Sequence, residues 1–167
     1  MNSAALLTDA FGRVRQIVHA VTDGLTADEL EARLDDEANT IAWLVWHLTR
    51  VQDDHVADAF GVPQVWGEYG QRFELPLEPY DTGYGHTPEQ VAQVTVSSPG
   101  LLTGYHDAVH EQTIRLVAGV TDADLPRIVD ERWDPPVTLG VRLVSVIDDC
   151  AQHIGQAAFV RGVLLGR

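Results

Sequence analysis

Two short segments of the sequence carry side chains that can bind a metal ion. Asp149 and His153 lie four positions apart in DDCAQHIGQ, so in a helix they occupy one face, one turn from each other. His47 stands in the apolar run WLVWHLTRV. A carboxylate and two imidazoles from facing helices supply three ligands and leave one coordination position open. That arrangement is typical of catalytic metal centres, whereas structural sites are closed by a fourth protein ligand.

Each segment also has an interpretation without a metal. A buried imidazole nitrogen without a partner is costly, so His47 could be a core histidine bonded to a backbone carbonyl or a carboxylate. Asp149 and His153 could form a simple helical pair or part of a solvated face. Taken singly, each pattern favours these interpretations, and only their combination favours a metal site.

A second histidine pair competes for the same role. His106 and His110 have the same four-residue spacing, with Glu111 beside them, and are sterically as good a metal pair. Without a metal we expect them on a partly exposed polar face. His55 follows His47 by eight residues, about 12 Å along a helix axis, so these two cannot share an ion. The residues alone leave the choice between the two sites open.

The elements that position these side chains are helices. Apolar residues at helical spacing predict long helices over residues 3–21, 41–60, 99–118 and 139–165. Thr40 and Thr138 are candidate N-caps, and Gly61 ends the second long helix. Capping boxes predict shorter helices over 27–33 and 88–96. Strand-like segments are scarce, so the predicted fold class is all-α: one domain over 1–167 that forms a four-helix bundle.

Residues 62–85 separate the second long helix from the third. The segment contains four glycines, several prolines and most of the tyrosines, and we interpret it as a long crossover loop. Loops of this length are uncommon unless they are functional or cover something. Its aromatic residues either anchor the loop or line a substrate entrance: Trp66, Tyr69, Tyr80 and Tyr84.

The composition excludes several classes of function. The formal net charge is −14 without a basic patch, which disfavours binding to nucleic acid. All eleven basic residues are arginines, so Schiff-base chemistry on lysine is excluded. Apolar runs do not reach the roughly 18 residues that a membrane span needs, and the N-terminal sequence is unlike a signal peptide. We therefore expect no membrane partner and a cytoplasmic location.

Three other residues are candidates for a role at the site. Cys150 is the single cysteine, which excludes cysteine-rich zinc sites, and beside two aspartates it is best interpreted as a packing residue. Arg50 and Arg142 either bind a carboxylate of a substrate or form surface ion pairs, which contribute little. The last helix is apolar around much of its circumference, so it is either central or the interface of a homodimer.

Two segments resemble the DinB-like superfamily of metal-binding four-helix bundles. TIAWLVWHL, residues 40–48, resembles the signature around its first ligand, and DCAQHIGQ, residues 149–156, resembles the signature on its last helix. The crossover and the Tyr105-His-Asp-Ala stretch are also similar. The resemblance implies His47, Asp149 and His153 as ligands rather than the third-helix pair. The superfamily commonly uses three histidines. The branch resembling the N-terminal domain of mycothiol-dependent maleylpyruvate isomerase has a carboxylate, usually Glu, where this chain has Asp149.

The resemblance also implies a function. Characterised relatives use mycothiol or bacillithiol, so we expect a metal-dependent enzyme that takes a small-molecule thiol and an electrophilic substrate through transfer or isomerisation. The expected cofactor is a divalent ion, Zn²⁺ first, with Ni²⁺ or Fe²⁺ as options for a His, His and carboxylate set. Two alternatives stay open: a hydrolase that uses metal-activated water, and a non-catalytic metal-binding or stress-response module.

Overall fold

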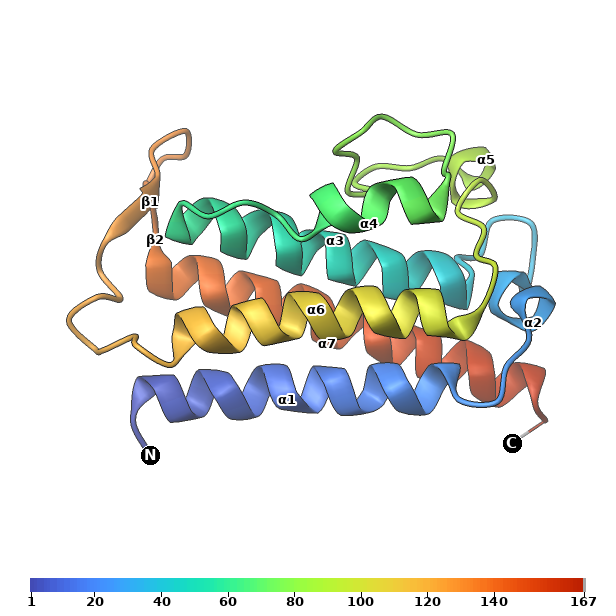
Figure 1. Ribbon diagram of the computed structural model, residues 1–167, viewed down its shortest axis with the longest axis horizontal. Helices are drawn as coiled ribbons and strands as arrows, with labels where there is room; N and C mark the ends of the chain where they lie inside the picture. Colours follow the sequence, from blue (N-terminus) through green and yellow to red (C-terminus); the bar gives the residue numbers. More distant parts are fainter. Residues whose placement is uncertain (167) are drawn as a thin grey trace.

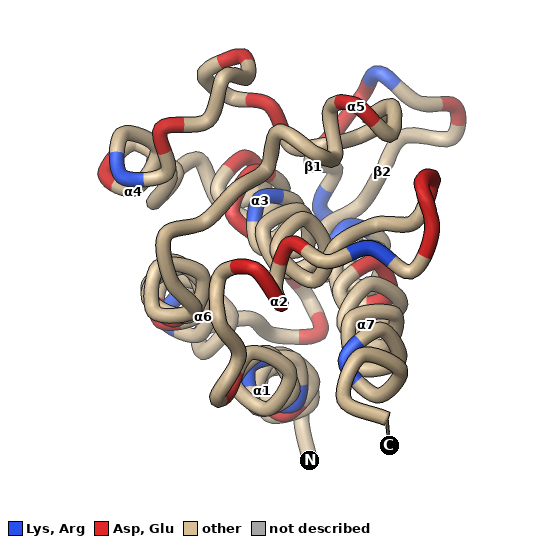
Figure 2. Tube along the Cα trace, turned by 90° about the vertical axis from the view of Figure 1, so that its right-hand side faces the viewer, with Lys and Arg blue, Asp and Glu red and all other residues tan. Residues whose placement is uncertain are grey.

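Four long helices pack side by side along the length of the molecule (Figure 1). The computed structural model describes residues 1–166. Within this range the long helices are α1 (Ser3–Thr22), α3 (Ile41–Phe60), α6 (Pro99–Val117) and α7 (Leu139–Leu164). Viewed from the end of the bundle, α3 has α6 and α7 as its neighbours, and α1 lies diagonally opposite (Figure 2). The predicted all-α four-helix bundle is confirmed.

Local sequence signals set where these helices begin and end. The side chains of Thr40 and Thr138 cap the first turns of α3 and α7, as predicted. Gly61 ends α3 in the left-handed conformation that favours glycine, with φ of 65°. Capping boxes start the short helices α2 (Ala27–Glu31) and α5 (Pro88–Val91), which both end earlier than predicted.

The helix directions require a long connection between α3 and α6. Figure 1 shows that these two helices run the same way, so the chain has to travel back along the bundle between them. Part of this crossover is the helix α4 (Trp66–Phe73), where we predicted loop. The glycines of α4 suggested irregular structure, but Gly70 packs against the ring of Trp66, where an added Cβ would lie 3.1 Å from Cε2. Packing of the indole overrides the low helix propensity of glycine.

A small two-stranded sheet closes the end of the bundle between α6 and α7. Strands β1 (Ile128–Asp130) and β2 (Val137–Thr138) pair antiparallel in a segment that the sequence presented as irregular. The strands are too short for an alternating pattern to emerge from the sequence. They place β1, which ends at Asp130, beside α3 and α7, and β2 beside α7.

The side chain of Arg50 holds the crossover against α3. It is 0% exposed, and its guanidinium donates hydrogen bonds to the backbone carbonyls of Tyr80 and Asp81 and to the side chain of Gln64. It also lies over the ring of Trp66, 4.8 Å from the centroid. The expectation of a surface ion pair or a substrate-binding role is therefore wrong for Arg50, because every face of its guanidinium is enclosed by protein.

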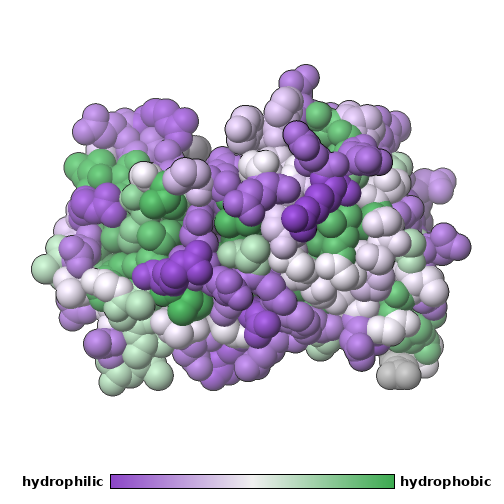
Figure 3. Space-filling model, in the orientation of Figure 1, coloured by the Kyte–Doolittle hydropathy of each residue, from purple (hydrophilic) through white to green (hydrophobic). Residues whose placement is uncertain are grey.

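Among the described residues, no helix is both long and apolar enough to cross a bilayer. The face in Figure 3 mixes hydrophilic and hydrophobic side chains. Exposed apolar side chains do occur on α7, including Val144 and Phe159, which are 65% and 66% exposed.

Candidate metal centre

The three predicted ligands converge between α3 and α7. His47, Asp149 and His153 each offer a ligand atom, and these atoms lie within 4.8 Å of one another. The rings of His47 and His153 meet edge to face with their centroids 4.7 Å apart. The one-turn spacing of Asp149 and His153 puts both on the face of α7 that packs on α3. The tertiary structure thus groups the residues that the sequence proposed.

Asp149 has the surroundings of a metal ligand. Its Oδ1 lies 3.6 Å from Nε2 of His153. Its Oδ2 is buried and has no hydrogen-bond partner among residues 1–166. A buried carboxylate oxygen without a partner is costly, and a divalent cation held by two imidazoles would satisfy it. The donor set therefore fits a divalent ion, and Asp149 places a carboxylate oxygen within 4.8 Å of a ligand atom of each histidine.

Each histidine uses one ring nitrogen for orientation and leaves the other available. Nδ1 of His47 donates a hydrogen bond to the backbone carbonyl of Thr82. Nδ1 of His153 donates to Oε1 of Gln156 at 3.0 Å. In both residues the lone pair is then on Nε2. Metal-binding histidines usually bind the ion through one ring nitrogen and donate a hydrogen bond from the other. The interpretation of His47 as a core histidine bonded to a carbonyl and its interpretation as a ligand are thus compatible.

The electrostatics of the two histidines differ. Burial lowers the pKa of His47, so its imidazole is neutral at neutral pH, the form that binds metal. The nearby carboxylate of Asp149 raises the pKa of His153. A proton on His153 and a metal ion would therefore compete for the same two side chains.

Residues of the crossover, together with Trp43 of α3, form the wall of the candidate centre. Trp43 stacks on His47 with ring centroids 4.5 Å apart, and its Nε1 donates to Nδ1 of His86 at 3.1 Å. His86 in turn donates to Asp81 at 3.0 Å. Gly83 approaches so closely that an added Cβ would lie 2.9 Å from Nδ1 of His47. Sequence reasoning missed His86 and Asp81, because the spacing within a loop does not say what the loop packs against.

An open cavity of about 680 Å³ adjoins the centre. His47 and Asp149 form one end of it. The rest of its lining comes from α3, the crossover, the β1–β2 connection and α7, and includes Val51, His55, Tyr84, Trp133, Arg142 and Ser145. Of the crossover aromatics that we proposed as an entrance, Tyr84 lines this cavity and is 93% exposed. A small molecule can therefore reach the candidate ligands from solvent.

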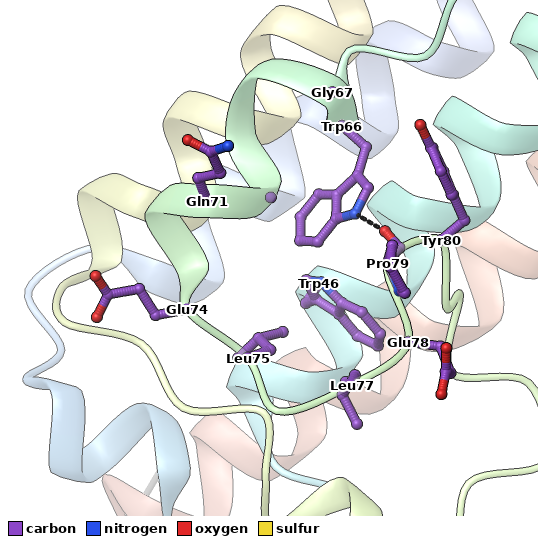
Figure 4. Close-up of a pocket in the computed structure, with 11 residues that line it drawn as sticks. Trp46, Trp66, Gly67, Gln71, Glu74, Leu75, Leu77, Glu78, Pro79 and Tyr80 are labelled. Carbon is purple, nitrogen blue, oxygen red and sulfur yellow. Dashed lines mark hydrogen bonds between the residues drawn. The ribbon is translucent and has the colours of Figure 1, made fainter.

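A second cavity, of about 380 Å³, lies under α4 (Figure 4). Trp46, Trp66 and Tyr80 line it, and Nε1 of Trp66 donates to the backbone carbonyl of Pro79 at 2.7 Å. The three candidate ligands do not contribute to its lining. Trp66 and Tyr80 thus belong to a separate hollow on the crossover side of α3.

The rival residues occupy other positions. His106 is fully buried rather than partly exposed, and its Nδ1 pairs with the hydroxyl of Thr49 at 3.1 Å. His106 and His110 stack with centroids 6.4 Å apart, and among residues 1–166 they are not grouped with a third ligand. His55 lines the far part of the cavity. Cys150 is buried and its thiol pKa is raised by burial, consistent with a packing residue.

Fold and site together define a DinB-like helical bundle with a candidate three-ligand metal centre beside an open cavity. The chain belongs to the family described as Mycothiol-S-transferase, which matches residues 6–166. Among solved structures it is similar to a conserved protein of locus from Enterococcus faecalis, with 28% identity and a TM-score of 0.92. That similarity covers 100% of this chain and 99% of the other. No protein of curated function matches the chain.

Proposed function

We propose that this protein is a metal-dependent transferase that uses a low-molecular-weight thiol of the mycothiol type. One observation carries the proposal. Oδ2 of Asp149 is buried beside the imidazoles of His47 and His153 and has no hydrogen-bond partner within residues 1–166. These three residues would hold a divalent ion, with Zn²⁺ as first choice. The family supports the thiol and the transfer reaction.

The ion would lower the pKa of a coordinated thiol, so that thiolate is available at neutral pH. The protein residues set up this chemistry. The carbonyl of Thr82 fixes the ring of His47, and Gln156 fixes that of His153. Trp43 covers one face of His47 and keeps water away from it. In the reaction the thiol would lose its proton to solvent and its sulfur would bond to an electrophilic carbon. Either a leaving group such as chloride departs from that carbon, or the sulfur adds to a double bond whose other carbon takes up a proton; an isomerisation also requires the thiol to leave again.

The surroundings favour thiol transfer over hydrolysis. The hydrolase that we considered would use a nearby carboxylate as its general base. Asp130 lines the cavity, but hydrogen bonds from Arg132 hold its pKa well below the usual range, which makes it a weak base. Asp148 is exposed, accepts a hydrogen bond from Gln152 and is not among the lining residues. A non-catalytic metal-binding module remains the alternative that experiment has to separate from the transferase.

Three finer expectations stay predictions. The first is that the chain resembles the maleylpyruvate isomerase branch, which has a carboxylate ligand at the position of Asp149. A homodimer through the exposed apolar side chains of α7, such as Val144 and Phe159, is compatible with their exposure. A cytoplasmic location fits a partner thiol of low molecular weight. Light scattering of the purified protein tests the dimer directly.

Elemental analysis comes first among the tests of the function. We expect about one divalent ion per chain in the wild type and a loss of it in His47→Ala, with His106→Ala as a control that keeps the metal. The loaded protein should then conjugate mycothiol to an aromatic electrophile such as chlorodinitrobenzene. Metal binding without turnover on any thiol would favour the non-catalytic module, and an absence of metal would reject the proposal.

A further inference from the structure

At the end of the cavity away from Asp149 lies a buried arginine with one unpartnered nitrogen. Arg142 is 9% exposed and lines the cavity. Its Nη2 donates to Oδ2 of Asp130 at 2.8 Å, and its Nη1 makes a long contact of 3.4 Å with Nδ1 of His55. Its Nε is buried and has no hydrogen-bond partner among residues 1–166. Because Arg142 lines the cavity and only its Nη2 makes a short hydrogen bond, its guanidinium can donate to a further acceptor in the cavity.

The local charge is suited to an anion. Asp130 is ionised, because hydrogen bonds from Arg132 hold its pKa well below the usual range, and it is shared between Arg132 and Arg142. Two guanidinium groups thus share one carboxylate at this end of the cavity, and the other carboxylate of the lining, Asp149, lies at the candidate metal centre. Burial and the charge of Arg142 lower the pKa of His55, so its ring is neutral at neutral pH and adds no charge. Asp54, which contacts His55, lines a neighbouring cavity and is not in this lining.

The candidate centre and the arginine lie about two helical turns apart along the bundle. Arg142 and Asp149 are seven residues apart on α7, which is about 10 Å along a helix axis. His55 and His47 are eight residues apart on α3, about 12 Å. Val51 and Ser145 line the cavity between the two ends. One molecule can therefore bridge both ends along the packed faces of α3 and α7.

We infer that Arg142 forms an anion-binding subsite that selects molecules with a carboxylate about 10 Å from the atom at the metal centre. This inference rests on the proposed function, because the distance to the carboxylate is counted from the proposed metal centre. The carboxylate belongs either to the thiol or to the electrophile. The two sources share the same recognition chemistry and are separated by experiment.

The direct test compares thiols of two lengths with and without a charge, by calorimetry on the zinc-loaded protein. ω-Mercaptooctanoic acid spans about 10 Å when extended, with C–C bonds of roughly 1.5 Å. We expect it to bind at least about tenfold tighter than ω-mercaptooctanol, the gain of one charge-assisted contact. β-Mercaptopropionic acid is too short to reach Arg142 and should gain far less over γ-mercaptopropanol.

Variants test whether Arg142 is responsible for the tighter binding of the acid. Arg142→Met should remove the preference for the acid, and Ser145→Asp, at an exposed position of the cavity wall, should reduce it without touching the Arg142–Asp130 pair. Ser145→Asp keeps the test valid if Arg142→Met fails to fold. Arg13→Met makes the same change of charge on α1, outside the cavity lining, and should keep the full preference.

The two proposals fail in different ways. Equal affinity for the acid and the alcohol in a protein that holds one zinc per chain would overturn the subsite and leave the metal centre standing. Absence of zinc and of binding by both thiols would overturn both. To find the source, turnover of a neutral thiol is measured with maleimidocaproic acid and with N-hexylmaleimide. Faster reaction of the acid assigns the carboxylate to the electrophile, and equal rates beside tight binding of carboxylated thiols assign it to the thiol.

Discussion

The backbone carbonyl of Thr82 accepts a hydrogen bond from Nδ1 of His47, although the two residues are 35 positions apart in the sequence. This contact decides which nitrogen of His47 faces Asp149 and His153. A loop carbonyl therefore sets the chemistry of a helix residue, and the crossover is part of the centre rather than a cover over it.

The close approach of Gly83 to His47 predicts a paired experiment. Gly83→Ala places a Cβ 2.9 Å from Nδ1 of His47, at φ of 88°, so the crossover must move and the Thr82 hydrogen bond weakens. We expect metal affinity to fall about tenfold or more, the usual effect of losing an orienting partner. Gly85→Ala is the control, because its φ of 74° gives similar backbone strain while its Cβ would meet nothing within 4 Å. Equal metal affinity in the two variants, measured by competition with a chelator, would contradict the role of the crossover.

Loss of one ligand should be distinguishable from loss of a buried histidine. His153→Ala leaves two candidate ligands and should abolish stoichiometric metal binding. His106→Ala removes a core side chain and should lower the stability by about 1–3 kcal/mol while metal content is kept. Elemental analysis and urea unfolding of both variants check this. Retention of metal by His153→Ala, or its loss from His106→Ala, would place the ion elsewhere.

Removal of Arg50 should destabilise the protein and loosen the crossover. Arg50→Met leaves the carbonyls of Tyr80 and Asp81 without their donor and strips Asp53 of its buried cation, at a cost of about 3–5 kcal/mol. Arg13→Met removes an exposed i,i+4 pair and should leave the stability unchanged. Urea unfolding measures both. Similar stability of the two variants would mean that the enclosed guanidinium contributes no more than a surface one.

The buried His106 predicts a pH dependence of stability. Burial lowers its pKa to about 3, so the folded state keeps the ring neutral while the unfolded chain takes up a proton near its ordinary pKa of about 6.5. The stabilisation from this group is complete above pH 6.5 and is lost as the pH falls toward 3. His106→Leu should therefore lose less stability than the wild type between pH 7 and about pH 5. Parallel curves for the two proteins in urea unfolding would contradict this assignment.

The sequence by itself determined the helices and the composition of the site. Thr40, Thr138 and Gly61 set helix ends through contacts within a turn, and the four-residue spacing of Asp149 and His153 puts them on one face. These features depend on hydrogen bonds and periodicity between near neighbours, which the order of residues specifies directly. The bundle and its crossover followed from the same signals.

Only the tertiary structure decided what the crossover does. That a helix begins at Trp66 and continues through Gly70, that Arg50 is enclosed, and that Thr82 meets His47 all depend on packing of side chains that the local sequence does not specify. Residue types within a glycine-rich segment permit many backbone paths, and the path is selected by burial of the aromatic rings and by partners for the buried guanidinium. The candidate ligands could be predicted from the type and spacing of residues. Their orientation and the cavity beside them depend on long-range packing.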